Sequence, residues 1–138
     1  MLRKFLLLIP AAFLGYSAHA QLEKVIHQTF DPADLTNITI NLEEEYELQS
    51  WSGNQILTET FIQLYDASPE ILKFFIEEKH RYEITMITEG EGMTLESTDQ
   101  ERNPIQYHGT ECYEFVRTKV FVPESYERAG DNQLRRID

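Results

Sequence analysis

The stretch QILTETFIQLY, residues 55–65, decides the class of fold. Its side chains alternate with the period of two that is typical of an extended strand, and apolar residues fall on both faces. A strand that is apolar on both faces is expected to lie inside a sheet and to be covered, at least in part, on each side. The sequence therefore predicts a β protein with this strand near its centre.

Further strands are predicted on both sides of this stretch. The same alternation of apolar and polar residues marks segments 25–30, 38–42 and 46–51 before it, and 82–90, 93–95 and 112–122 after it. The final segment stops at Pro123, and the polar residues that follow it are expected to be loosely held.

One α-helix is predicted between two of these strands. Ser68 suits the N-cap and Pro69 the first helical position, and apolar residues then recur at helical spacing. Lys79 and Arg81 place cations where the helix is expected to end. The predicted fold is mainly β, either a short β-solenoid or a two-layer β structure, with the helix at about 69–79 packed on the sheet or capping it.

Residues 1–20 have the features of a secretory signal peptide. A positive start is followed by an apolar run of about 10 residues, which is too short to span a bilayer, and by a small-residue cleavage site ending at Ala20. We therefore expect an extracytoplasmic protein, secreted or periplasmic, without a membrane span in the mature chain. The expected organisation is a signal peptide over 1–20, a single β-rich domain over 21–123 and a polar C-terminal tail over 124–138.

Acidic side chains outnumber basic ones by 24 to 12, which gives a formal charge of -12. Loss of Arg3 and Lys4 with the signal peptide would change this charge to -14. Such a chain repels phosphate backbones, so nucleic acid is not an expected partner. Much of the acidic excess falls at 43–45 and 89–101, where it is expected to promote solubility and to protect sheet edges.

No motif typical of a catalytic site is found, and we expect a non-enzymatic protein without a cofactor. The histidines of the mature chain lack metal-ligand spacing. The abundant carboxylates leave two alternatives open, a small extracytoplasmic carboxylate-dependent hydrolase and a calcium-binding envelope module. The candidate calcium ligands are Glu89, Glu91, Asp99 and Glu101.

Aromatic side chains are the candidates for binding a protein or carbohydrate partner. Trp51 stands beside a Ser-Gly-Asn turn, and Tyr46, Tyr65 and Tyr107 supply further rings with a polar group. The alternative for Trp51 is that it caps the core beside this turn. The oligomeric state is left open.

Cys112 is the single cysteine and cannot form a disulfide within the chain. Because it stands where the last strong strand begins, we expect a buried, inert thiol. Pairing with another chain is the alternative.

Part of the chain resembles the adhesin family of secreted bacterial proteins. The resemblance covers about residues 25–65 and 115–123, and it consists of short alternating strands, Trp51 followed by a Gly53-Asn54 turn, and a strand that ends in Pro123. It implies a β-solenoid of short strands with a surface-adhesive role and no catalytic residues. The chain departs from that pattern in its helix and its acidic 89–101 segment, and it is short for a solenoid, which needs about three or more repeats.

Overall fold

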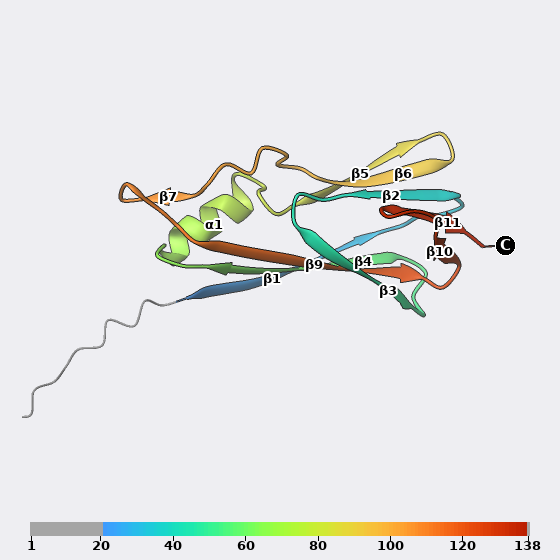
Figure 1. Cartoon of the computed structure of the whole chain (residues 1–138), viewed down its shortest axis with the longest axis horizontal. Helices are drawn as coiled ribbons and strands as arrows, with labels where there is room; N and C mark the ends of the chain where they lie inside the picture. The colour runs from blue at the N-terminus through green and yellow to red at the C-terminus, as the bar shows by residue number, and fades with distance from the viewer. Residues whose placement is uncertain (1–20, 138) are drawn as a thin grey trace, which may run out of the picture.

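Two β-sheets pack face to face in the computed structural model, which describes residues 21–137 (Figure 1). Sheet A has the strand order β1 (Leu22–Phe30), β4 (Ile56–Leu64), β9 (Glu114–Pro123), β3 (Glu45–Trp51). Sheet B has the order β10 (Tyr126–Arg128), β11 (Gln133–Arg136), β2 (Asn37–Asn41), β6 (Gly92–Ser97), β5 (Ile84–Glu89). A separate hairpin pairs β7 (Gln106–Tyr107) with β8 (Thr110–Glu111). The mainly β fold with one helix is confirmed, and of the two predicted arrangements the chain forms the two-layer one.

Strand β4 lies inside sheet A, as its sequence predicts. It pairs antiparallel with β1 on one side and with β9 on the other. Along β4 every second residue, from Ile56 to Leu64, is buried, and the residues between them are partly buried. The two-sided apolar pattern thus corresponds to one face in the core and one face that is partly covered.

The interior contains two apolar clusters. The first lies between the sheets and includes Ile56 of β4, Val120 of β9 and Ile38 of β2. The second lies under helix α1 (Pro69–Glu77) and includes Ile62 of β4 and Leu72 of the helix. Figure 1 shows α1 over the end of sheet A that sheet B does not cover. The helix therefore takes the place of a second sheet at that end.

The start of α1 is as predicted, but its end differs. Pro69 is the first helical residue, and the Ser68 hydroxyl accepts a hydrogen bond from the backbone N–H of Ile71 at 3.3 Å. The helix ends at Glu77, so Lys79 and Arg81 follow it and the prediction of cations in its last turn is wrong. Because β4 and β5 belong to different sheets, the helical segment carries the chain from one sheet to the other.

The predicted loose tail over 124–138 is wrong. Strand β11 lies between β10 and β2, and the side chains of Tyr126 and Leu134 are buried in the first cluster. The Tyr126 hydroxyl also donates a hydrogen bond to the carbonyl of Leu35. The domain predicted to end at 123 extends through these strands, since only a few widely spaced apolar residues are needed to anchor them.

Two further predictions concern the membrane and the signal peptide. Within the described part of the chain, α1 is short and no helix has the length and hydropathy to cross a bilayer. The predicted signal peptide over residues 1–20 lies outside the described residues.

A substitution in β11 tests whether the C-terminal strands belong to the folded core. Leu134→Ala is expected to lower the free energy of unfolding by about 2–5 kcal/mol, because it removes a buried side chain from the first cluster. Gln133→Ala, at the exposed neighbouring position, is the matched control and should have little effect. Urea denaturation measures both changes, and equal small effects would contradict the placement of β11 in the core.

Candidate functional site

A polar layer separates the two apolar clusters. Thr58 and Thr60 interrupt the buried face of β4, and the Thr60 hydroxyl lies 3.2 Å from that of Thr118 on β9. The Thr118 hydroxyl donates to the Glu44 carboxylate at 2.8 Å, and Arg102 donates to the other oxygen of Glu44 at 2.9 Å. These contacts connect sheet A to the loop that follows β6.

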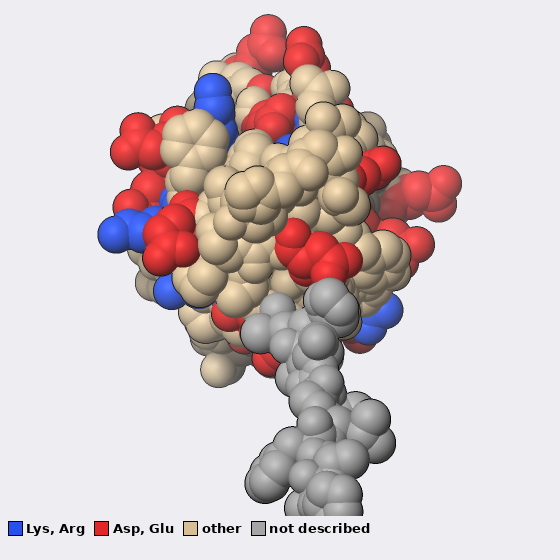
Figure 2. All heavy atoms as spheres, turned by 90° about the vertical axis from the view of Figure 1, so that its left-hand side faces the viewer, with Lys and Arg blue, Asp and Glu red and all other residues tan. Residues whose placement is uncertain are grey.

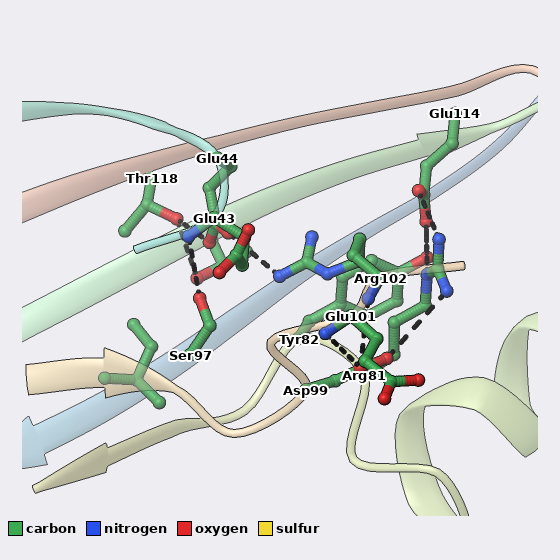
Figure 3. A network of polar contacts seen from close by, with 12 residues as sticks. Glu43, Glu44, Arg81, Tyr82, Ser97, Asp99, Glu101, Arg102, Glu114 and Thr118 are labelled. Atoms are coloured by element: carbon green, nitrogen blue, oxygen red, sulfur yellow. Dashed lines mark hydrogen bonds and ion pairs between the residues drawn. The ribbon is translucent and has the colours of Figure 1, made fainter. Parts of the chain in front are cut away.

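The layer continues to a buried ion pair between Arg81 and Glu114 (Figure 3). Arg81 donates from Nε and Nη2 to the two oxygens of Glu114, each at 2.9 Å, and from Nη1 to the carbonyl of Asn103 at 2.6 Å. The Arg81 side chain is only 3% exposed and that of Glu114 is 15% exposed. A bidentate pair of this kind fixes the segment after α1 against the start of β9.

Tyr82 completes this network. Its hydroxyl donates to Glu114, and the guanidinium of Arg102 lies 5.4 Å from the centre of its ring. Burial and the neighbouring Glu114 raise the pKa of Tyr82, so the phenol stays protonated and acts as a donor. Burial alone would raise the pKa of Glu114, but hydrogen bonds from Arg81 and Tyr82 together with the charge of Arg81 outweigh it and lower that pKa.

A hollow of about 400 Å³ lies beside this network and is lined in part by Arg81, Glu114, Cys112 and Tyr113. The charges of Arg81 and Glu114 are already neutralised by each other. A carboxyl with a lowered pKa is ionised at neutral pH, which is the opposite of what a general acid requires. The network has the chemistry of a structural brace that links the two halves of the core.

Cys112 is buried, as expected. Its thiol lies 3.5 Å from the carbonyl of Asp66. Burial, together with the charges of Asp66 and Glu114, raises the pKa of Cys112. Because the thiolate is the reactive form, the site disfavours nucleophilic chemistry at this residue.

The aromatic residues proposed from the sequence do not form one surface. Trp51 pairs with Pro123 at the end of β9, whereas Tyr65 bonds through its backbone to Tyr113 just before β9 begins. Ten residues of β9 separate these positions by about 30 Å. Tyr46 is partly buried against the first cluster, and Tyr107 against the second.

Trp51 closes the turn that follows β3. Its indole Nε1 donates to the carbonyl of Gln55 at 2.8 Å, and its ring lies 6.2 Å from that of Phe121. A Cβ at Gly53 would lie only 2.4 Å from the Trp51 ring, so the ring is seated directly on this glycine. Trp51 thus packs on its own turn and on Phe121, and neither apolar cluster includes it.

The candidate calcium ligands lie in two separate places. Glu89 and Glu91 belong to the turn between β5 and β6, whereas Asp99 and Glu101 follow β6 at the far end of the same hairpin. The paired strands separate the two sets by about 17 Å. Within residues 21–137 no group of three or more His, Cys, Asp or Glu side chains is arranged to hold a metal ion.

Acidic side chains are also spread over the end of the molecule that carries α1. Figure 2 shows them over this face, many at its margin and some nearer its middle, with a few Lys or Arg side chains and a neutral surface between them. Among the described residues, two large aromatic side chains are exposed at this end of the fold, Tyr113, which is 65% exposed, and Phe74 of α1. The charge is dispersed rather than gathered into a ligand set, as expected of side chains that promote solubility.

Strand β5 forms an exposed edge of unusual composition. Four strands lie at the ends of the two sheets. Of these, β3 and β10 carry charged residues along their length, whereas β1 carries Glu23 and Lys24 only at its start and has His27 in contact with Glu59. On β5 the run from Ile84 to Thr88 has no charged residue, and Met86 and Ile87 are 39% and 42% exposed. Charged residues commonly protect an edge strand from pairing with another chain, and β5 lacks them between Ile84 and Thr88.

The side chain of Gln28 is bonded to one end of this edge. Its Nε2 donates to the carbonyl of Ile84 at 3.1 Å, and its Oε1 accepts from the Ile84 N–H at 2.9 Å. In an antiparallel pair, alternate residues direct both backbone groups away from the partner strand. The backbone N–H and C=O of Ile84 point away from β6, so the backbone groups of Met86 and Thr88, two and four residues later, point the same way. These outward N–H and C=O groups have no hydrogen-bond partner among the described residues.

The sequence analysis predicted neither the Arg81–Glu114 brace nor the edge position of β5. Arg81 and Glu114 are 33 positions apart, and no local pattern signals their contact. The run of uncharged residues between Glu83 and Glu89 is visible in the sequence, but only the sheet order shows that it lies at an edge. Comparisons of this chain with protein-family models, with curated proteins and with solved structures find no match.

The brace predicts a specific dependence of stability on pH. The lowered pKa of Glu114 stabilises the fold above its unfolded value of 4.5, and this contribution is lost as the pH falls through the folded value. Glu114→Ala is therefore expected to lower the free energy of unfolding by roughly 3 kcal/mol near neutral pH, since among residues 21–137 it leaves the buried Arg81 with only the longer 4.0 Å contact to Asp99 as an ion pair. The loss of unfolding free energy caused by Glu114→Ala should become smaller at acidic pH, where Glu114 is protonated in the unaltered protein as well.

Denaturation in urea at neutral pH and at about pH 3 measures both quantities. Glu111→Ala removes the same charge from the nearby exposed strand β8 and serves as the control. An equal response of the two variants at every pH would contradict the role given to the Arg81–Glu114 pair.

Proposed function

We propose that this protein is a non-enzymatic binding protein, acting outside the cytoplasm, that accepts an extended segment of a partner protein at the edge of β5. The observation that carries the proposal is the uncharged edge with outward backbone groups at Met86 and Thr88. Such groups pair readily with an added strand, in the manner of many peptide-binding domains.

The energetics of this edge support a modest, reversible contact. An added strand could form hydrogen bonds with the N–H and C=O groups of Met86 and Thr88, each contributing about 0.5–1.5 kcal/mol net. It would also cover part of the exposed Met86 and Ile87 side chains, which contributes hydrophobic free energy. A footprint of this size belongs to the class of weak or transient interfaces.

The geometry also indicates what the incoming strand should present. Met86 lies opposite Leu95, a core residue of β6, whereas Ile87 lies opposite Thr94 and so points to the other face. The edge therefore offers one apolar side chain on each face of sheet B. A fitting partner strand would carry apolar residues at two successive positions.

The resemblance to secreted adhesins implies a binding role, although the β-solenoid that it also implies is not the two-layer fold of this chain. The location outside the cytoplasm is supported by the signal-peptide features of the sequence. The carboxylate hydrolase is the alternative function; Glu114, whose pKa is lowered, is engaged in an ion pair with Arg81.

Selection from a library of displayed random peptides tests the proposal. Peptides enriched on the purified protein are expected to bind Ile87→Lys at least about tenfold more weakly, because the lysine places a charge on the edge. Val25→Lys is the matched control, since Val25 is 43% exposed on β1, the edge of the other sheet. Affinities are measured by titration calorimetry, and thermal melting shows that each variant is folded.

Two results would overturn the binding proposal. One is a selection that enriches no peptide above background. The other is a set of enriched peptides that bind Ile87→Lys as well as the unaltered protein but lose affinity for Val25→Lys.

A further inference from the structure

Gln28 sets where an added strand can begin. Its side-chain amide already makes both hydrogen bonds that a partner strand would make with Ile84. An incoming chain is therefore excluded at Ile84 and has Met86 and Thr88 as its first and second pairing positions. The available edge then leads toward the turn at Gly90, where β5 ends.

Negative charge is concentrated at that turn. Glu89 ends β5 opposite Gly92, Glu91 lies between them, and neither side chain makes an ion pair within residues 21–137. At the opposite end of β5, Glu83 contacts the His80 ring at 3.0 Å, and Glu96 of β6 lies opposite Thr85. Figure 1 shows the β5–β6 turn projecting at the end of the molecule opposite α1. Glu89 and Glu91 thus place two carboxylates, without an ion pair in the described part of the chain, at the turn end of the available edge.

A second copy of this chain is a poor occupant. Antiparallel pairing of two β5 strands would bring the turn of one copy to the Ile84 end of the other, where Gln28 fills the pairing position. Parallel pairing would place the Glu89 side chains of both copies together, and like charges side by side are unfavourable. The formal charge of -12 adds repulsion between copies.

We infer that the occupant of β5 is a short strand from a different protein, with two successive apolar residues beside Met86 and Ile87 and basic residues beside Glu89 and Glu91. This inference rests on the proposed function and adds the chemistry and position of the partner. Exposed charge pairs contribute little affinity individually, so the basic end acts mainly on selectivity and orientation.

Synthetic peptides with a common Thr-Val-Ile-Val-Thr core test the inference. The core is extended by Lys-Lys, Gln-Gln or Glu-Glu, placed at either end, and both termini are blocked. At about 0.01 M ionic strength, one of the two Lys-Lys peptides is expected to bind roughly three- to tenfold more tightly than its Gln-Gln counterpart. The Glu-Glu peptide should bind more weakly than both, and the preferred end gives the direction of the strand.

Two double variants and one hydrogen-exchange measurement show which residues cause the preference for lysine and where the peptide binds. Glu89→Gln with Glu91→Gln should abolish the preference for lysine, whereas Glu45→Gln with Glu47→Gln changes the net charge equally on the distant edge strand β3 and should retain it. In amide hydrogen exchange, Met86 and Thr88 should become protected on binding. Ile84 should be protected by Gln28 before and after, and should exchange rapidly in free Gln28→Ala.

The possible results distinguish the basic partner strand from strand addition at β5 itself. Equal binding of the Lys-Lys, Gln-Gln and Glu-Glu peptides, with protection at Met86 and Thr88, overturns the basic partner and leaves strand addition intact. Absence of binding by every peptide, with no change in exchange, overturns the proposed function as well. A dimer through β5, detected by sedimentation, overturns the inference in favour of a second copy.

Discussion

The structure depends on one constraint, the burial of one face of each sheet against the other. Ile38 and Val120, from opposite sheets, meet in a single apolar cluster that neither sheet could form alone. An open pair of sheets necessarily has exposed edges, and charged side chains run along two of the four, β3 and β10. The uncharged run of β5 from Ile84 to Thr88 lacks this protection and exposes Met86 and Ile87.

The second constraint is that sheet A is longer than the part covered by sheet B. Helix α1 buries the remaining apolar residues, and the polar layer from Glu44 to Glu114 lies where the two kinds of cover meet. Burying Arg81 is favourable only because Glu114 and a backbone carbonyl satisfy its donors. The brace thus joins parts of the core that apolar contacts alone would leave independent.

Local features of the fold could be predicted from the sequence because their causes are local. The alternation of 55–65 placed β4 inside a sheet, and Ser68-Pro69 marked the start of the helix. The C-terminal strands could not be recognised, because a few separated apolar residues such as Tyr126 and Leu134 anchor a largely polar segment. The Arg81–Glu114 contact and the edge position of β5 depend on the assembled sheets, which no local pattern records.

The place of β11 has a consequence for how the chain reaches its native state. Its residues 133–136 pair with β2, whose residues 37–41 are made much earlier. Sheet B is incomplete until residues 133–136 have left the ribosome, so its strands cannot close in order of synthesis. Pairings between such distant segments favour slow folding, on the order of milliseconds to seconds. Until then the nascent chain remains open to chaperones, and loss of residues 133–136 would deprive β2 of a neighbour.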